Sequence, residues 1–450
     1  MTFNHQADLS VAKQYPKGQP VSNRPGDQAR LWLDTSSDSE RMSRCKKTLM
    51  ISVLPFPAAV RNDMSMKYGD HQFFWVPMLN DLNIDRFPDL LEYTDMLKDI
   101  VKQQHVTGVV SRLDLETLVH AALSEEFPHI SGPTVESCFL ALHKFYSRTV
   151  LDPNPIPCEA LDLDSPTLEE DANLPYRGWD YIKGALTGAK FNPYNPSIHL
   201  LRNFVVRYLD TKKYPLALRQ VIVLEKYVDV KMKVTVDGYV HKGKVNHLLT
   251  TESVYFPSRW DNAAGCYHPC RATAQVKDDI VKTFVKVVEG MTALGFDNQV
   301  LHGEFFVKSS GAPSLIEINV GRLGLSHLQV CLRQGDPVRL QLQLVSGEGV
   351  DLLRVGECPV FLGYIVPRSS GPATDYIDFD KVDEISREQG VHVVMKVDKD
   401  DQITMLGQGG GLGDYVARVV IRGLSYEESV EKFKRFSKQI LKKQEWYAWL

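Results

Sequence analysis

The feature that most constrains the fold of this chain is the segment 301–324, which reads LHGEFFVKSSGAPSLIEINVGRLG. It contains two short apolar runs separated by the turn residues 309–311. Apolar runs of this length with a glycine-containing turn between them predict two β-strands paired as a hairpin. Glu304 lies in the first predicted strand, and Glu317 and Asn319 lie two residues apart in the second. Side chains two residues apart share a face of a strand, so a hairpin would bring all three onto one face.

Two carboxylates and an amide in this arrangement have two interpretations. The simpler one is a pair of exposed glutamates on a solvated hairpin. The flanking residues favour burial instead, because Phe305, Leu315 and Ile318 are typical of buried strands, where an unpaired carboxylate is costly. Carboxylate and amide oxygens are ligands that Mg²⁺ prefers, with phosphate oxygens completing its shell. The segment therefore predicts a metal site for phosphoryl transfer, in which the nearby Arg322 would neutralise charge on the phosphate.

The same segment resembles the metal-binding end of the ATP-grasp superfamily, whose pattern runs His-x-Glu, an apolar strand, a turn, Glu-x-Asn and an arginine. The resemblance implies that Glu304, Glu317 and Asn319 bind Mg²⁺ or Mn²⁺. It also implies that Arg322 is the catalytic arginine that stabilises the phosphate and an acyl-phosphate intermediate. The chain departs from the pattern in one respect, because Arg322 follows Glu317 by five residues and the family usually places this arginine four residues after the second glutamate.

Other segments resemble parts of the superfamily's ATP site and occur in the expected order. Residues 221–228, VIVLEKYV, resemble the hinge strand beside adenine, where backbone groups of Lys226 and Val228 would pair with the base. Residues 181–183 resemble the strand whose lysine reaches the α- and β-phosphates, and a second family lysine corresponds to Lys144. The resemblance thus implies an ATP site formed by Lys144, Lys183, Glu225, Lys226, Tyr227 and Val228.

Each of these matches has a plainer alternative. Residues 221–228 could be an ordinary buried strand. Lys144 and Arg148 are four residues apart, so they could form a solvated basic face of a helix. The superfamily's lid loop is rich in glycine, whereas the stretch GALTGAK after Lys183 has two glycines and offers fewer free backbone N–H groups to a phosphate. We expect the lid at residues 183–194.

The substrate side of the site is less defined. Asp237 matches a strand whose acidic residue points toward the substrate, which makes it a candidate for binding the amine. Residues 266–270, CYHPC, could supply three zinc ligands, but the spacing is not that of a zinc finger and no second cluster follows. By the resemblance this stretch enters the substrate pocket, so His268 and Arg259 are predicted substrate contacts. The glycine-rich residues 407–413 lack the lysine of a phosphate-binding loop and predict a flexible turn.

The predicted fold class is α/β (α+β), and 450 residues predict two or three domains. Residues 1–46 are polar with little periodicity, which predicts a mobile tail. Strand and helix patterns alternate over 47–135, as in a parallel α/β lobe. The resemblance implies an ATP-grasp domain over 136–335 and a small C-terminal α+β lobe over 336–450.

Charge and hydropathy exclude several classes of partner. The formal net charge of −4 predicts neither a nucleic-acid nor a membrane partner. No apolar stretch approaches the roughly 20 residues of a membrane span, and residues 1–46 lack the apolar run of a signal peptide. The seven cysteines are scattered and odd in number, which argues against a disulfide framework. We therefore expect a cytoplasmic protein with small-molecule partners, and a homodimer stays open.

The resemblance implies a reaction. The γ-phosphate of ATP passes to a substrate carboxylate, an amine attacks the acyl phosphate, and an amide, ADP and phosphate result. The order of the lobes is most similar to L-amino-acid ligases and carnosine synthase, so the amine would be an amino acid or a small amine. Two alternatives stay open: a non-catalytic ATP-binding protein of the synapsin kind, and a ligase with a thiol or another acceptor that is not an amino acid.

Overall fold

The structure is a computed structural model of the chain. It describes residues 45–52, 58–77, 90–112, 114–162, 221–256, 259–324, 331–351, 353–366, 370–403 and 415–442, and the backbone of strands β1 (Trp32–Leu33), β6 (Tyr181–Gly184) and β7 (Lys190–Phe191). Most of the predicted tail at 1–46, most of the predicted lid at 183–194 and the glycine-rich residues 407–413 lie outside the described residues.

The N-terminal part is an α/β layer, and its central strands are parallel, as the sequence predicts. Its sheet has the order β1-β3-β2-β4, in which β2 runs parallel to β3 and β4 and the edge strand β1 is antiparallel. Leu49 and Ile51 of β2 are fully buried against Leu97 of a helix, because every second residue of this apolar strand faces the same side. The elements are β2 (Lys46–Ser52), α2 (Ala58–Lys67), β3 (His71–Pro77), α3 (Leu90–Gln104), β4 (Gly108–Val110) and α4 (Asp114–Glu126).

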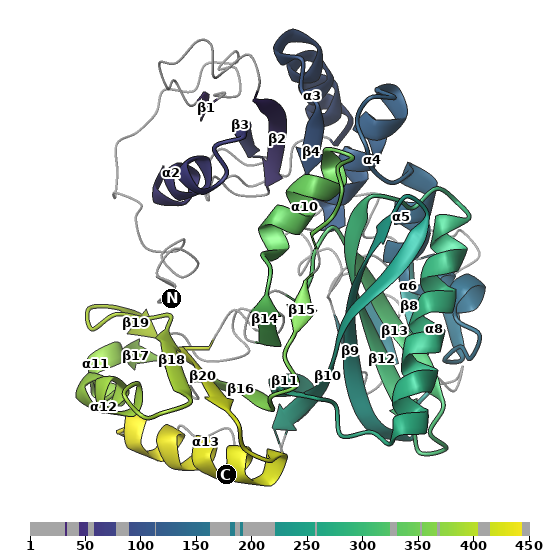
Figure 1. The fold of residues 1–450 in the computed structure, drawn as a ribbon. Coiled ribbons are helices and arrows are strands. Elements are labelled where there is room, and N and C mark those ends of the chain that lie inside the picture. Colours follow the sequence, from purple (N-terminus) through teal and green to yellow (C-terminus); the bar gives the residue numbers. More distant parts are fainter. Residues whose placement is uncertain are drawn as a thin grey trace.

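An eight-stranded sheet forms the centre of the molecule (Figure 1). Its order is β13-β12-β9-β10-β11-β16-β20-β18, and all neighbouring strands are antiparallel. The strands are β9 (Val230–His241), β10 (Lys244–Phe256), β11 (Arg259–His268), β12 (Gln299–Lys308), β13 (Pro313–Val320), β16 (Val360–Ile365), β18 (Val391–Met395) and β20 (Ala417–Arg422). The predicted hairpin 301–324 is therefore one edge of a long sheet.

Two tight turns in this sheet explain local sequence. Lys242 and Gly243 between β9 and β10 have φ of 51° and 72°, the left-handed pair of a two-residue hairpin turn. Gly311 between β12 and β13 has φ of 89°. Glycine adopts such angles without steric cost, which explains the glycine in each turn and confirms the hairpin predicted at 301–324.

One face of strands β9, β12 and β13 is apolar and covered by helices. Helix α8 (Ala274–Thr292) lies along this face, and Phe284 of α8 packs among fully buried residues such as Val234 and Phe305 (Figure 1). The buried residues of α8 recur at helical spacing and form one stripe: Ile280, Phe284, Val287, Val288 and Met291. Along β9 and β12 the apolar face takes every second residue, so the residues between them point to the other face.

A smaller sheet of order β5-β8-β6-β7 stands beside the large one. The helical segments α5 (Val135–Leu142), α6 (Lys144–Tyr146) and the π-helical turn Ser147–Leu151 lead into its first strand. That first strand is β5 (Cys158–Asp162), and the others are β8 (Val221–Glu225), β6 and β7. The predicted strands at 181–183 and 221–228 are present, although β8 ends at Glu225.

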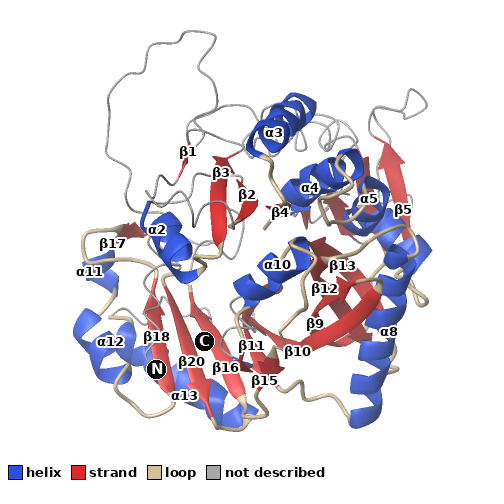
Figure 2. Cartoon of the chain, turned by 45° about the horizontal axis from the view of Figure 1, so that its top comes forward, coloured by secondary structure: helices blue, strands red, loops and turns tan. Residues whose placement is uncertain are grey.

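Helix α10 (Pro337–Val345) lies between the N-terminal sheet and the large sheet (Figure 2). Its Leu342 and Val345 are buried with Trp75 of β3. The N-cap residue Asp336 accepts bonds from the backbone N–H groups of the first turn and one of 2.7 Å from the hydroxyl of Tyr68. This helix thus fixes the N-terminal layer onto the remaining chain.

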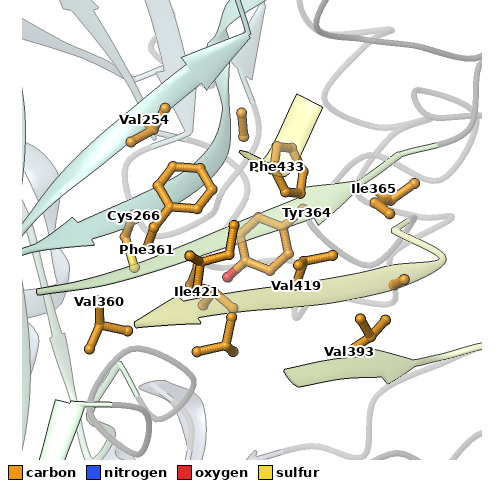
Figure 3. Close-up of a cluster of buried hydrophobic side chains, with 14 of the residues drawn as sticks. Val254, Cys266, Val360, Phe361, Tyr364, Ile365, Val393, Val419, Ile421 and Phe433 are labelled. Carbon is orange, nitrogen blue, oxygen red and sulfur yellow. The ribbon is translucent and has the colours of Figure 1, made fainter. Parts of the chain in front are cut away.

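The C-terminal region continues the large sheet through β16, β20 and β18. Figure 3 shows Phe361, Tyr364, Val419 and Phe433 in the core of this region. Helix α13 (Tyr426–Ile440) is capped at Ser425, which forms a reciprocal capping box with Glu428 and so sets the start of the helix. Its other elements are β14 (Leu332–Gln334), β15 (Arg354–Val355), β17 (Gly371–Pro372), α11 (Ala373–Tyr376), α12 (Phe379–Ile385) and β19 (Gln402–Ile403). The predicted domain divisions, including the one at residue 335, stay predictions.

Among the helices that the structure describes, none combines the length and apolar character needed to cross a bilayer.

Candidate functional site

The face of β9, β12 and β13 that points away from the apolar core carries a row of polar side chains. Glu304 of β12 is directly opposite Glu317 of β13, and His302 is directly opposite Asn319. On the other side of β12, His302 is opposite Asp237 of β9. Directly opposite residues in an antiparallel pair point to the same face. The register thus confirms that Glu304, Glu317 and Asn319 share one face, as the sequence predicts.

Each glutamate of this row has a lysine as counter-ion. The Nζ of Lys144, the first residue of α6, lies 3.3 Å from Oε2 of Glu317. Lys233 of β9 forms an ion pair with Oε2 of Glu304. Burial opposes ionisation of both carboxyls, but the ammonium groups outweigh it, so the pKa of each glutamate lies below its ordinary value. Burial also opposes the charge on Lys233, and Glu304 still raises the pKa of that lysine.

Arg322 reaches this face through a glycine turn. Gly321 follows β13 with φ of 76°, and its N–H donates a 2.9 Å bond to the carbonyl of Val300. The turn brings one Nη of Arg322 to 2.5 Å from Oδ1 of Asn319. Gly321 lies between Glu317 and Arg322, and its left-handed backbone turns the chain so that Arg322, five residues after Glu317, lies beside Asn319.

Three buried atoms around this turn have no hydrogen-bond partner in the part of the chain that the structure describes. They are Oδ1 of Asp114, Nδ2 of Asn319 and Nε of Arg322. The first and last of these face each other at 3.9 Å, within ion-pair reach but beyond a hydrogen bond. Burial raises the pKa of Asp114, although Arg322 opposes the shift. Buried polar atoms are nearly always hydrogen-bonded, so this cluster indicates a place that a polar ligand completes.

The hinge strand β8 is connected to the hairpin by a buried arginine. Arg148 is fully buried, and its Nε and one Nη donate bonds of 2.8 and 2.6 Å to the carbonyl of Ile316. Its other Nη forms an ion pair with the buried carboxylate of Glu225. Ile316 is the extra residue of a β-bulge between Glu317 and Leu315, which leaves its carbonyl available for a side-chain donor. Burial of Lys144 and Arg148 excludes the solvated basic face.

The other predicted hinge residues have mixed surroundings. The N–H of Lys226 donates a 3.0 Å bond to the carbonyl of Pro157, so any backbone pairing of Lys226 with a base would use its carbonyl. Tyr227 is half exposed, at 52%, and Val228 is partly buried. Lys183 is opposite Val223 in the β6–β8 pairing, and its side chain lies outside the described residues. The adenine and phosphate contacts of these residues stay predictions.

The carboxylate of Asp237 is hydrogen-bonded to neighbouring groups of the protein. Its Oδ1 lies 2.8 Å from Nδ1 of His302 and accepts a 2.6 Å bond from the backbone N–H of Gly324. Burial disfavours the charged imidazole, but Asp237 outweighs it and raises the pKa of His302. Asp237 thereby fixes the His302 ring and the segment after Arg322, whereas its predicted contact with an amine stays a prediction.

The remaining predicted substrate contacts lie at β11. Both ring nitrogens of His268 face carbonyls, that of Thr250 at 3.3 Å and that of Gly356 at 3.1 Å. Arg259 begins β11, and its side chain is outside the described residues. Within the described ranges no three His, Cys, Asp or Glu side chains form a metal-binding group, and Cys266, His268 and Cys270 are among the residues searched. The hairpin offers two carboxylates and an amide, so a metal there needs phosphate oxygens as well.

Sequence reasoning missed three residues of this site. Lys233 and Asp237 have the same parity on β9, but only the β9–β12 register shows that Lys233 lies diagonally from Glu304. Asp114 begins α4, and the loop closure that brings it to Arg322 has no local signal. His302 is part of the motif that predicts the metal site, yet its bond to Asp237 requires the sheet.

Comparison with known proteins supports the fold. No family model and no curated protein matches the sequence. An L-amino acid ligase from Bacillus licheniformis superposes with a TM-score of 0.64 and 15% identity, over 89% of this chain and 99% of that one. N5-carboxyaminoimidazole synthase from Aspergillus clavatus, in complex with ADP and 5-aminoimidazole ribonucleotide, gives 0.59 and 14% over 88% and 98%. Biotin carboxylase from Campylobacter jejuni gives 0.59 and 13% over 88% and 91%. At these identities the likeness concerns the fold, and this chain has the fold of the ATP-grasp ligases.

Proposed function

We propose that this protein is an ATP-dependent ligase that activates a carboxylate as an acyl phosphate and joins it to an amine. The observation that carries the proposal is the pair Glu304 and Glu317, held opposite each other in one register and flanked by Lys144 and Arg322. Like charges directly opposite in a sheet are destabilising, and Lys144 and Lys233 offset that repulsion here. Two ionised carboxylates held together beside an amide oxygen form a donor set that a divalent cation can bind. The structural neighbours are ligases of the same fold, which supports the general reaction.

The donor set fits a hard divalent cation. Glu304, Glu317 and Asn319 supply carboxylate and amide oxygens, and Mg²⁺ usually binds through one or two carboxylates together with substrate phosphates. When bound, Mg²⁺ or Mn²⁺ would neutralise charge on the phosphate oxygens of ATP. The unpartnered Nδ2 of Asn319 and Nε of Arg322 are donors that a phosphate oxygen would accept from.

The chain's own groups then have distinct tasks. Lys144, already beside Glu317, would bind phosphate directly, and Lys183 would be a second phosphate ligand from β6. Arg322 would stabilise the negative charge that develops on the transferred phosphoryl group. Arg148 holds Glu225 in place at the end of the hinge strand. The acyl phosphate must be kept from water until the amine attacks, which is the task we assign to the segment 183–194.

An amino acid is the first choice for the amine. The reasons are the likeness to an L-amino acid ligase, which covers 99% of that protein, and the order of lobes along the sequence. A thiol or another acceptor would use the same metal site, so substrate identity requires a direct assay.

The test is incubation of the full chain with Mg-ATP and pooled amino acids, with ADP, phosphate and new product masses as readouts. The expected result is ADP release that depends on amino acids, with a product mass equal to that of two condensed substrates. ADP release that appears with a thiol pool alone would identify the other acceptor class. Nucleotide binding without release of ADP under any acid and amine pair would replace the ligase with a non-catalytic ATP-binding protein.

A further inference from the structure

The second counter-ion of the site, Lys233, belongs to the sheet itself. It lies on β9, which is paired with β12 on one side and with β10 on the other. On β12 it is opposite Phe306. Phe306 is two residues from Glu304, so Lys233 and Glu304 lie diagonally on the same face. Its ammonium forms the ion pair with Oε2 of Glu304, and the side chain of Tyr255 on β10 is its second polar neighbour. Lys233 is therefore held by the β12 ladder through its backbone and by two side chains, and the next residue, Val234, is paired with β10.

Lys144 differs from Lys233 in how it is held. It comes from the short helix α6 outside the large sheet, and its Nζ lies 3.3 Å from Glu317. A rotation of its flexible side chain can transfer this ammonium from the carboxylate to a phosphate. The backbone of Lys233 is paired with Phe306 of β12, and its side chain, which is 16% exposed, has both Glu304 and Tyr255 as partners. The positive charge beside Glu304 is thus a permanent part of the site.

We propose that Lys233 takes the place of one divalent cation, so that the site binds ATP with one metal ion rather than two. Two carboxylates opposite each other are suited to a pair of metal ions clamped on a polyphosphate. The Lys233 ammonium occupies Oε2 of Glu304 and repels a dication on that side, and the repulsion is strong because the pair is poorly screened by water. Glu317 and Asn319 carry the single ion, and Glu304 contributes through its other oxygen. This inference rests on the proposed function.

The experiment counts metal ions. The full chain is mixed with one equivalent of the non-hydrolysable analogue AMPPNP, and free Mn²⁺ is followed by electron paramagnetic resonance during a titration. AMPPNP alone binds one Mn²⁺ and would give the same count as the expected complex, so the chain–nucleotide complex is first separated from free AMPPNP by gel filtration. Chain without nucleotide is the blank. The expected count is one Mn²⁺ per chain–nucleotide complex for the natural sequence. A count of two for the natural sequence overturns the inference and leaves the ligase proposal intact.

Variants test the role of the charge. Lys233→Met removes the ammonium, and we expect the count to increase from one to two. Lys233→Arg keeps the charge and should keep one ion. Lys231→Met, the same change at an exposed lysine on the same strand, is the matched control and should also keep one ion. An unchanged count in a folded Lys233→Met chain overturns the inference, and absence of any nucleotide-dependent Mn²⁺ binding in the natural chain overturns it together with the proposed function.

Discussion

Replacing Gly321 by alanine tests how the glycine turn places Arg322. A Cβ on Gly321 would lie 2.0 Å from Oγ1 of Thr117, a distance that real atoms do not tolerate. That hydroxyl is bonded to Ser111 at 3.0 Å and donates a 3.3 Å bond to the carbonyl of Val320. The substitution therefore has to move a buried, bonded side chain or the turn itself.

The size of the effect has two parts. A left-handed backbone angle costs an alanine roughly 1–2 kcal/mol relative to glycine. Loss of the bonds of a buried hydroxyl adds about 1–3 kcal/mol. Gly321→Ala is thus expected to destabilise the fold by roughly 2–5 kcal/mol in total.

Gly243 provides a matched control for the backbone cost of the substitution. It has nearly the same φ, 72° against 76°, but a Cβ there would meet nothing within 4 Å. Gly243→Ala should therefore show the backbone cost alone, about 1–2 kcal/mol. The double variant Gly321→Ala with Thr117→Ala should recover part of the second cost, because the hydroxyl in the way is gone.

The assay is urea unfolding followed by tryptophan fluorescence, combined with ATP turnover under the conditions that support ligation. Gly321→Ala should also lower turnover more than Gly243→Ala does, since the turn holds Arg322 beside Asn319. Equal stability of the Gly321→Ala and Gly243→Ala chains would refute the close approach to Thr117. Full turnover in Gly321→Ala would refute the role of the turn in placing Arg322.

Three further predictions concern other parts of the molecule. Arg148→Met should destabilise the chain by about 3–5 kcal/mol by leaving Glu225 buried without its partner, and adding Glu225→Gln should restore part of this in the same urea assay. Glu317→Gln should abolish ATP turnover while the circular dichroism spectrum stays unchanged; turnover at the natural rate would remove this carboxylate from the metal site. Burial lowers the pKa of His120 to about 4 from 6.5, so the unfolded chain binds more protons in that range and stability should fall as the pH drops from 6.5 toward 4. His120→Gln should reduce this slope by about one proton, and an unchanged slope would contradict the assignment.

Local patterns predicted the elements of the site well. The parity of Glu304, Glu317 and Asn319 on two apolar strands was enough to predict a shared face, because strand side chains alternate strictly. The hairpin turn at Gly243 and the start of the last helix at Ser425 were predictable for the same reason, since turn and cap residues act over three or four positions.

Contacts between distant segments could not be predicted in this way. The bulge at Ile316 shifts the register by one residue, and its carbonyl meets Arg148 across 168 positions of sequence. The burial of Arg148 was equally hidden, because its spacing from Lys144 is also typical of an exposed helix face. Lys233 contacts Glu304 because the sheet places β9 beside β12, although β10 and β11 come between these two strands in the chain. Each of these contacts depends on the topology of the fold, which no short motif encodes.

The continuity of the eight-stranded sheet limits how the molecule can move. Strands β11 and β16 are joined by four residue pairs, and Gly265 lets them approach so closely that a Cβ there would lie 2.1 Å from the carbonyl of Leu362. The glutamate hairpin and the C-terminal region are thus two ends of one continuous hydrogen-bonded sheet. If the proposed ligase closes over its nucleotide by a movement of the smaller sheet, that movement would act on the Arg148 guanidinium, which is bonded to Ile316 of one sheet and Glu225 of the other.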